Sequence, residues 1–363
     1  NPELPASPQF NSPSRSPPPK KDPPFTYSGA NLNAIDFPVG GFGAGNVKIS
    51  GDGTLQNYSN VNQPKASTVH MPNNFWGISA APANSPTKTQ SFVLASPETF
   101  TNHTCNLPSH EPASVSRAAV KRLQTLPGIK SFTLTGTYPT ANLDYDITDF
   151  PLQVSMEAMS PCIPQDVKNS SLPCGYFTFT ITNPTTTTHT VRLLQSQQNF
   201  IGWDGTSDCS SNSNPKWGGN VNTAMNTNEY TSMNMSNPTT PDGTMSLAGV
   251  HNNESVATMT VIPAATDSSA MWTLFCNNKD VLPTKASPSE PSQPTFSTCC
   301  GIVQSTSIPP NTSVTLTFIL TWNFPNRLRD TLGLGQQYAT ILPSLLGNRY
   351  CDWFKYSDDV LAY

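Results

Sequence analysis

The chain has 363 residues, of which 36 are proline and 12% are charged, and its formal net charge is -4. An average domain carries about 25% charged residues and about 5% proline, so this chain is poor in charge and rich in proline. It has no basic cluster beyond Lys20 and Lys21 and no run of about 18 apolar residues, which argues against a nucleic-acid-binding surface and against a membrane span. Its many Ser, Thr and Asn residues favour strands and turns over helices.

Residues 1–25 form a proline-rich segment that contains nine prolines. This composition favours an extended polyproline II conformation and supplies no core, so we interpret the segment as a tail or linker. Two sharper interpretations stay open: an arm that docks on a neighbouring subunit, or a hydroxylated and O-glycosylated segment of the kind found in extracellular matrix glycoproteins. The candidate modification sites are Ser16, Pro17, Pro18 and Pro19.

From Phe25 onward the pattern predicts strands separated by turns. Two short apolar segments on either side of residues 51–53 predict a hairpin. Residues 152–158, 177–181 and 314–322 alternate apolar and polar side chains, which places each apolar set on one face of a sheet. A return strand is expected from Val191, after a turn at Asn183 and Pro184. These patterns predict an all-β fold, a large antiparallel two-sheet β-sandwich, over residues 26–335.

Helix is expected only in a short C-terminal segment, residues 336–363, which we interpret as a helical linker with helices at 336–346 and 352–363. Two stretches read as long loops: residues 204–228, rich in Ser, Asn and Gly, and residues 281–297, which contain four prolines. Long loops often carry binding surfaces, and padding covered by glycans or by a partner is the equal alternative.

Cysteines and glycosylation motifs indicate the compartment. The eight cysteines have no paired CxxC spacing, so disulfides are favoured over zinc, and together with six Asn-x-Ser/Thr motifs they predict a secreted or cell-surface glycoprotein. The chain begins at Asn1 without an initiator methionine, which we interpret as a mature, processed chain. The disulfide candidates are Cys105, Cys162, Cys174, Cys209, Cys276, Cys299, Cys300 and Cys351, and the N-glycosylation candidates are Asn57, Asn102, Asn169, Asn234, Asn253 and Asn311.

Groups that could carry chemistry are sparse. His103, Cys105 and His110 could converge on a metal ion, but a disulfide-bonded loop explains the same residues. Three carboxylates at positions 144, 146 and 149 could bind calcium, although turn-forming aspartates are the more common explanation. The sequence lacks a Gly-x-Ser-x-Gly elbow, so we assign no catalytic residue, no metal ligand and no cofactor.

Two further patterns concern glycines and tryptophans. Glycines 40, 41, 43 and 45 precede a strand and not a helix, so positive φ angles or close backbone approach are favoured over phosphate binding. Four tryptophans could form a platform for stacking sugars, although core or interface positions explain most of them. They are Trp76, Trp203, Trp217 and Trp272.

Several ordered segments resemble the N-terminal domain of glycoside hydrolase family 116, the non-lysosomal glucosylceramidase and β-glucosidase group. The opening is similar at Phe37-Pro-Val-Gly-Gly-Phe-Gly-Ala-Gly45 and Gly51-Asp-Gly-Thr-Leu-Gln-Asn-Tyr58, and later matches follow in the family's order. These later matches are residues 62–64, 150–164, 170–173, 177–184, 320–327 and the tail 347–363.

The resemblance implies a large β-sandwich that carries no catalytic residue, because the family's catalytic carboxylates lie in a helical barrel that follows this domain. Three hypotheses follow. The chain is a non-catalytic extracellular sandwich making structural or assembly contacts with copies of itself or with other glycoproteins, the accessory half of a secreted retaining β-glucosidase, or a carbohydrate-binding module. Whether the whole protein is an enzyme stays open, and we favour the non-catalytic reading for this chain.

Overall fold

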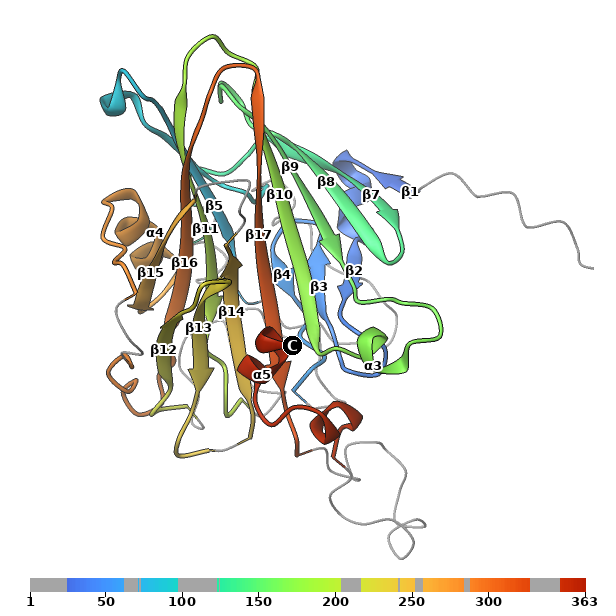
Figure 1. Cartoon of the computed structure of the whole chain (residues 1–363). Coiled ribbons are helices and arrows are strands. Elements are labelled where there is room, and N and C mark those ends of the chain that lie inside the picture. Colours follow the sequence, from blue (N-terminus) through green and yellow to red (C-terminus); the bar gives the residue numbers. More distant parts are fainter. Residues whose placement is uncertain are drawn as a thin grey trace, which may run out of the picture.

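The computed structural model describes residues 25–61, 71, 73–96, 123, 125–203, 217–240, 242–251, 257–283, 288–326 and 347–363. Within these residues the strands form three sheets whose ladders are antiparallel (Figure 1), which confirms the all-β prediction. The proline-rich segment and the expected helix at 336–346 lie outside the described residues. No helix in the described part is long and apolar enough to cross a membrane.

The largest sheet contains, in spatial order, β1 (Phe25–Tyr27), β7 (Ser131–Thr137), β8 (Thr140–Asp146), β9 (Gln153–Met159), β10 (Cys174–Asn183), β17 (Thr312–Asn323), β14 (Thr244–Val250), β13 (Tyr230–Ser236) and β12 (Val221–Asn226). The second sheet contains β15 (Thr258–Ala265), β16 (Cys299–Ile308), β11 (His189–Gln198), β5 (Trp76–Pro82) and β6 (Gln90–Val93). A small third sheet contains β2 (Asp36–Val39), β3 (Val47–Ser50) and β4 (Leu55–Gln56), which confirms the predicted hairpin.

The helical elements are short. They are the 3₁₀ helices η1 (Gly29–Ala34), η2 (Pro86–Lys88) and η5 (Arg349–Asp352), and the α-helices α3 (Val167–Ser170), α4 (Ser268–Cys276) and α5 (Ser357–Ala362). Helix α4 covers the second sheet, and α5 packs on β14 and β17 of the largest sheet. The predicted helix at 352–363 is therefore shorter than expected, and α4 was not predicted.

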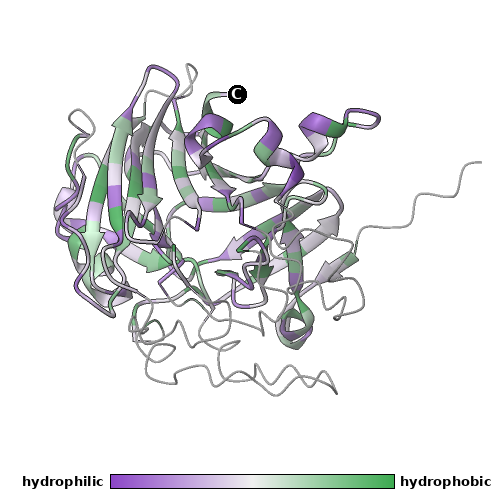
Figure 2. Cartoon of the chain, turned by 90° about the horizontal axis from the view of Figure 1, so that it is seen from below, coloured by the Kyte–Doolittle hydropathy of each residue, from purple (hydrophilic) through white to green (hydrophobic). Residues whose placement is uncertain are grey.

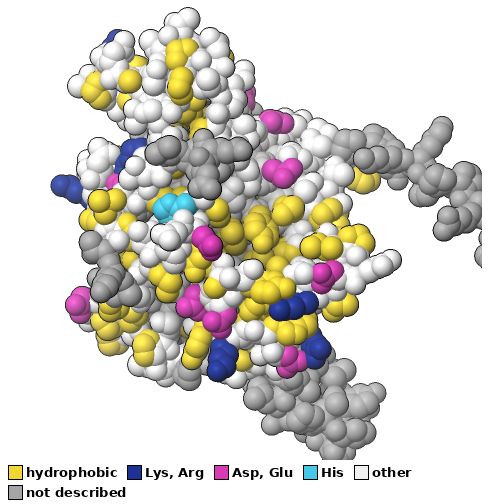
Figure 3. All heavy atoms as spheres, in the orientation of Figure 1, with side chains coloured by type: hydrophobic (Ala, Val, Ile, Leu, Met, Phe, Trp, Pro, Cys, Tyr) yellow, Lys and Arg dark blue, Asp and Glu magenta, His cyan; other side chains and the backbone are white. Residues whose placement is uncertain are grey.

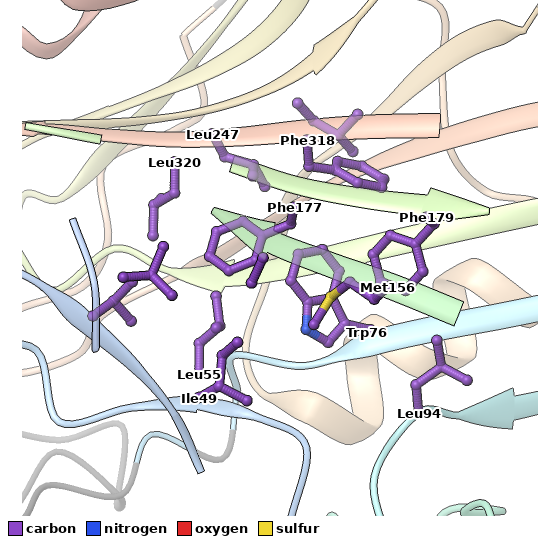
Figure 4. Close-up of a cluster of buried hydrophobic side chains, with 14 of the residues drawn as sticks. Ile49, Leu55, Trp76, Leu94, Met156, Phe177, Phe179, Leu247, Phe318 and Leu320 are labelled. Carbon is purple, nitrogen blue, oxygen red and sulfur yellow. The ribbon is translucent and has the colours of Figure 1, made fainter. Parts of the chain in front are cut away.

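The apolar core lies between the two large sheets (Figure 4). Its centre is Trp76 of β5, whose ring centroid lies 5.3 Å from Phe177, 5.0 Å from Phe179 and 5.6 Å from Phe318. The three phenylalanines lie on β10 and β17. On the opposite face of these two strands, the hydroxyls of Thr178 and Thr317 lie 3.2 Å apart. The alternation of hydrophobic and hydrophilic residues along the strands is visible in Figure 2.

The return strand predicted after Asn183 is present as β11, although it lies in the second sheet and not beside β10 in the largest one. The chain instead crosses to the second sheet as β11, and the link from β16 to β17 crosses between the same two sheets. Asn183 contacts both connections between the sheets. Its Nδ2 donates to the carbonyl of Thr187, before β11, and to that of Ile308, at the end of β16, both at 2.8 Å. This side chain therefore holds the sheets together at one end of the sandwich.

The two predicted long loops have different outcomes. Residues 221–226 form β12, so the loop predicted over 204–228 was wrong at that end, while residues 204–216 lie outside the described part. The segment 281–297 has no regular helix or strand among its described residues, and it contacts the sandwich through isolated bridges at Val281 and Pro288.

Candidate contact surface

Five large apolar side chains are exposed on loops and strand ends around α3. They are Phe42 (52% exposed), Tyr138 (51%), Met159 (37%), Ile163 (52%) and Val167 (71%), and we call this set the α3 surface. Hydrophobic side chains gather on the face of the molecule shown in Figure 3. Large exposed apolar patches mark contact sites in soluble proteins, whereas single exposed apolar residues do not.

The loop between β9 and α3 is fixed by the hydroxyl of Ser170. Its Oγ donates to the carbonyl of Ile163 at 2.8 Å and accepts from the amide of the same residue at 2.9 Å. The carbonyl of Ser170 accepts from the amide of Phe42 at 2.7 Å, which ties the glycine-rich loop to α3. The main chain at Ile163 and Phe42 is therefore held in place, although both side chains are exposed.

Glycine is required where this loop approaches its neighbours. A Cβ on Gly41 would lie 2.3 Å from the carbonyl oxygen of Leu172, and Gly43 and Gly45 adopt φ angles of 70° and 84°. L-residues with side chains rarely adopt such angles. The expected role of these glycines in positive φ and close approach is confirmed.

The turn between β7 and β8 completes the α3 surface. The ring centroids of Tyr138 and Phe42 lie 6.2 Å apart. The amide of Ser160 donates to the carbonyl of Pro139 at 2.9 Å, and Met159 is registered against Thr140. Turn, glycine-rich loop and the end of β9 therefore meet at one place.

The C-terminal segment is anchored beside the α3 surface. The hydroxyls of Ser246 and Ser357 lie 2.8 Å apart, and the Thr321 hydroxyl donates to the Ser357 carbonyl at 2.7 Å. The ammonium group of Lys168 on α3 lies 4.0 Å from the ring centroid of Tyr363 and 5.6 Å from that of Phe354. Helix α3 and the C-terminal segment therefore contact each other through a cation–π interaction.

The four candidate tryptophans do not form a sugar-stacking platform, and the expectation that most of them occupy core positions is confirmed. All four candidate tryptophans are buried, with 8% exposure or less, because each packs in a core cluster. Stacking a sugar requires an exposed aromatic face, and these residues do not present one. They are Trp76 at the centre, Trp203 and Trp217 in the same cluster, and Trp272 on α4.

The described carboxylates are dispersed, and the buried ones have structural partners. Asp52 accepts hydrogen bonds from Thr54 and Gln56 inside the β3–β4 hairpin. Asp280 forms a largely buried ion pair with Arg192. Among the described residues, no group of three or more His, Cys, Asp or Glu side chains is placed to hold a metal ion.

The three aspartates considered as a calcium site do not form a ligand group with other side chains in the described part. Asp144 and Asp146 project from the exposed face of β8 and not from a turn, while Asp149 adopts a turn conformation with φ of 58°. Asp146 lies 3.1 Å from the Lys130 ammonium. The other candidate metal residues, His103, Cys105 and His110, lie outside the described residues.

The six cysteines in the described part are free thiols and form no disulfide with one another. The disulfides expected from the sequence stay a prediction. Cys299 and Cys300 are consecutive on β16 and pack into different core clusters, because neighbouring residues on a strand point to opposite faces. Burial raises the pKa of Cys300 to about 12. The free thiols are Cys162, Cys174, Cys276, Cys299, Cys300 and Cys351, while Cys105 and Cys209 lie outside the described residues.

Four glycosylation candidates are described, and Asn311 is the most accessible. It lies at the exposed turn between β16 and β17 with φ of 56°. The Nδ2 atoms of Asn57 and Asn169 donate to Asp36 at 3.0 Å and to Asp166 at 2.6 Å, and Asn234 lies on β13. The remaining candidates, Asn102 and Asn253, lie outside the described residues.

A shallow hollow of about 530 Å³ lies beside the Asn311 turn. Most of its lining residues are serines and threonines, and no aromatic side chain contributes. A hollow without an aromatic face lacks the usual platform for a sugar ring. Its lining residues are Thr190, Thr258, residues 305–309 and residues 312–314.

Sequence reasoning missed the α3 surface because its members come from separate turns and strand ends. Apart from Met159, each is an isolated apolar residue outside a strand, and such residues carry no periodic signal. The available clue was the Pro-Cys-Ile-Pro segment at 161–164. The prolines indicate a loop, and a large apolar residue within a loop has no obvious role in the core.

Fold and surface together describe an all-β sandwich domain with a group of exposed apolar side chains. The family model described as beta-glucosidase 2, glycosyl-hydrolase family 116 N-term, matches residues 36–363, and the chain belongs to this family. Among solved structures, the chain is similar to a putative kojibiose phosphorylase from human microbiome, with 11% identity and a TM-score of 0.36. That match covers 91% of this chain and 35% of the phosphorylase. A comparison with curated proteins found no match.

Proposed function

We propose that this chain is a non-catalytic, extracellular accessory domain of a β-glucosidase-type glycoside hydrolase, and that it works by protein contact through the α3 surface. The observation that carries the proposal is the group of five exposed apolar side chains, with the main chain at Ile163 and Phe42 held by hydrogen bonds to Ser170. Membership of family 116 supplies the class of partner, a helical catalytic domain.

The chemistry of the α3 surface supports a protein partner. Aromatic residues and methionine are enriched at protein interfaces, and Phe42, Tyr138 and Met159 are of these types. Each is exposed, so covering it with a partner would remove apolar area from water. The hydrogen bonds around Ser170 fix the loop beforehand, which lowers the entropic cost of binding.

An extracellular location is supported by the accessible sequon at Asn311. The neighbouring residues Pro310 and Thr312 complete an exposed turn at the tip of the β16–β17 connection, where a glycan would project into solvent. Secretion of the chain from eukaryotic cells, followed by glycosidase treatment, should release a glycan from Asn311. Complete absence of a glycan at every sequon would contradict the glycoprotein part of the proposal.

The accessory role can be tested with the helical catalytic domain of a family 116 β-glucosidase, produced separately. We expect the chain alone to release no product from an aryl β-glucoside and to form a complex with that domain in sedimentation velocity. The double variant Ile163→Asp with Val167→Asp should weaken the complex at least tenfold, since it places two charges in the contact.

A matched control is available on the second sheet. Val281 and Leu282 are also exposed, and the double variant Val281→Asp with Leu282→Asp should leave the complex unchanged. Equal weakening by both double variants, or absence of any complex, would refute contact through the α3 surface. Hydrolysis by the chain alone, lost on changing one of its own carboxylates, would refute the non-catalytic role.

A further inference from the structure

We propose that residues 288–295, which we call the triplet repeat, protect the outer edge of the largest sheet, and that loosening them lets β12 pair with β12 of a second copy of the chain. The triplet repeat reads Pro-Ser-Glu-Pro-Ser-Gln-Pro-Thr, so a proline precedes a hydroxyl residue at every third position. Strand β12 is the last strand in the spatial order of that sheet among the described residues (Figure 1). The outer side of an edge strand carries N–H and C=O groups that can pair with another chain.

The triplet repeat is hydrogen-bonded to the outer side of β12 and to the residues just before this strand. The amide of Ser289 donates to the carbonyl of Asn222 at 2.7 Å, and the amide of Ser292 donates to the carbonyl of Asn220 at 2.9 Å. In return, the amides of Asn222 and Asn220 donate to the Oγ atoms of the same serines, at 3.1 and 3.0 Å. Each serine therefore occupies both backbone groups of one asparagine, as a residue of a neighbouring strand would.

The spacing of these bonds is that of a polyproline II helix. The two serines are three residues apart, and three residues make one turn of this helix. Each proline fixes its own φ and pushes the residue before it toward an extended conformation. The repeat ends at Thr295, whose amide donates to the carbonyl of Trp217 at 2.8 Å and whose φ is 69°. Ser289 and Ser292 are half-buried and face the sheet, while the residues between them are exposed.

The other side of the triplet repeat offers few partners to a further strand. Pro288, Pro291 and Pro294 are exposed and have no backbone N–H, so they cannot donate to another chain. The exposed Glu290 adds a charge between the first two prolines. Charges and prolines are the features that keep edge strands from pairing with other chains. The repeat therefore bonds β12 on one side and ends the sheet on the other.

Strand β12 is well formed beneath this cover. It is six residues long, and Nδ2 of Asn199 donates to the carbonyl of Val221 and to Oδ1 of Asn222 inside the sandwich. These bonds fix the strand from within, so its outer groups stay aligned when the repeat is loosened. Two copies of the chain carry the same edge, and an antiparallel pair of identical strands satisfies a two-fold axis. A second copy is therefore the partner that an uncovered β12 fits.

The experiment compares the double variant Ser289→Pro with Ser292→Pro against the control Gln293→Pro. The double variant removes the amide and the Oγ that bond β12 but keeps the polyproline II preference, whereas the control makes the same substitution at an exposed position. We expect the amides of Asn220 and Asn222 to exchange hydrogen at least tenfold faster in the double variant. We also expect it to sediment as a dimer at a concentration at which the unchanged chain and the control sediment as monomers.

A rescue variant tests whether the association uses β12. The side chain of Thr223 on β12 is half-buried, and Thr223→Lys places a charge on the edge strand. Added to the double variant, it should restore the monomer while the exchange at Asn222 stays fast. The milder pair Ser289→Ala with Ser292→Ala removes only the Oγ acceptors. It should show the same changes at a smaller size, so the test does not depend on folding of the proline variant.

Four results would overturn the proposal. Unchanged exchange at Asn220 and Asn222 in both serine variants would show that the repeat does not cover the edge. Faster exchange without a dimer would show that the uncovered edge does not pair. A dimer that persists with Thr223→Lys would place the contact elsewhere, and a dimer of the Gln293→Pro control would show that the serine bonds are not what matters.

Discussion

Strand β11 passes through two regions of the interior that are stabilised in different ways. At its start, Val191 and Leu193 face the apolar centre around Trp76. Further along the strand, Gln195 and Gln197 occupy the next positions on the same face, and both are buried. A two-residue period places side chains on a face of the sheet, but it does not decide whether that face is apolar.

The second region is a buried amide network centred on Asn199, just after β11. The Nδ2 of Asn199 donates to the carbonyls of Val221 and Ser236 and to Oδ1 of Asn222, at 3.0 to 3.1 Å. Its Oδ1 accepts from the amide of Ile201 and from Nδ2 of Asn220. The network joins the end of the second sheet to β12 and β13. Hydrogen bonds therefore hold the two sheets together here, as apolar packing does at the centre.

The largest effect is expected at the apolar centre. Phe179 is fully buried and packs against Trp76, Phe318 and Tyr145. Phe179→Ala should lower the free energy of unfolding by about 3–5 kcal/mol, through lost transfer energy and the cavity left behind. Urea unfolding followed by Trp fluorescence measures it. Phe179→Leu should cost much less, and equal costs for the two variants would show that packing volume does not determine this region.

In the amide network, by contrast, a substitution that preserves the side-chain volume should still lower stability, because it removes hydrogen-bonding groups. Asn199→Leu keeps a similar volume but leaves several buried donors and acceptors without partners, each costing about 1–3 kcal/mol. We expect a loss of about 3 kcal/mol in the same unfolding assay. Asn228→Leu, at an exposed position, is the control and should change stability by less than about 0.5 kcal/mol. Tolerance of Asn199→Leu would erase the contrast between the two regions.

The sequence predicted the fold where polar and apolar residues alternate and failed where buried residues are polar. Residues 177–181 and 314–322 became β10 and β17 as expected. Strand β12 was missed because its inward residues include Asn222, whose burial depends on a partner far away in sequence. The α3 surface was missed because its residues meet only after folding. The burial of the tryptophans agrees with the core positions expected for most of them.

Alkaline pH should weaken the apolar interior before it affects carboxylate-dependent contacts. Burial raises the pKa of the Cys300 and Cys174 thiols from 9.0 to about 12. A thiol with a raised pKa contributes stability that is complete below pH 9 and is lost as pH rises toward 12, because the unfolded chain releases its proton first. Each thiol should remove about 1.4 kcal/mol by pH 10. Unfolding measured between pH 8 and 10.5 should show this slope, and Cys300→Ala should reduce it; an unchanged slope in the variant would contradict the assignment.

The smallest effect is expected where neither burial nor a network operates. Lys168 contacts the rings of Tyr363 and Phe354 from a half-buried position near the surface, so Lys168→Gln should cost about 0.5–1 kcal/mol. Because the contact joins only α3 to the C-terminal segment, the loss should appear as faster amide hydrogen exchange in α5, with little change in global unfolding. Lys355→Gln, beside the same helix, provides the control for removing a charge. Faster exchange in the strands around Phe179 would show instead that the C-terminal segment is coupled to the apolar centre, and that the division between interior and edge is not as sharp as the contacts indicate.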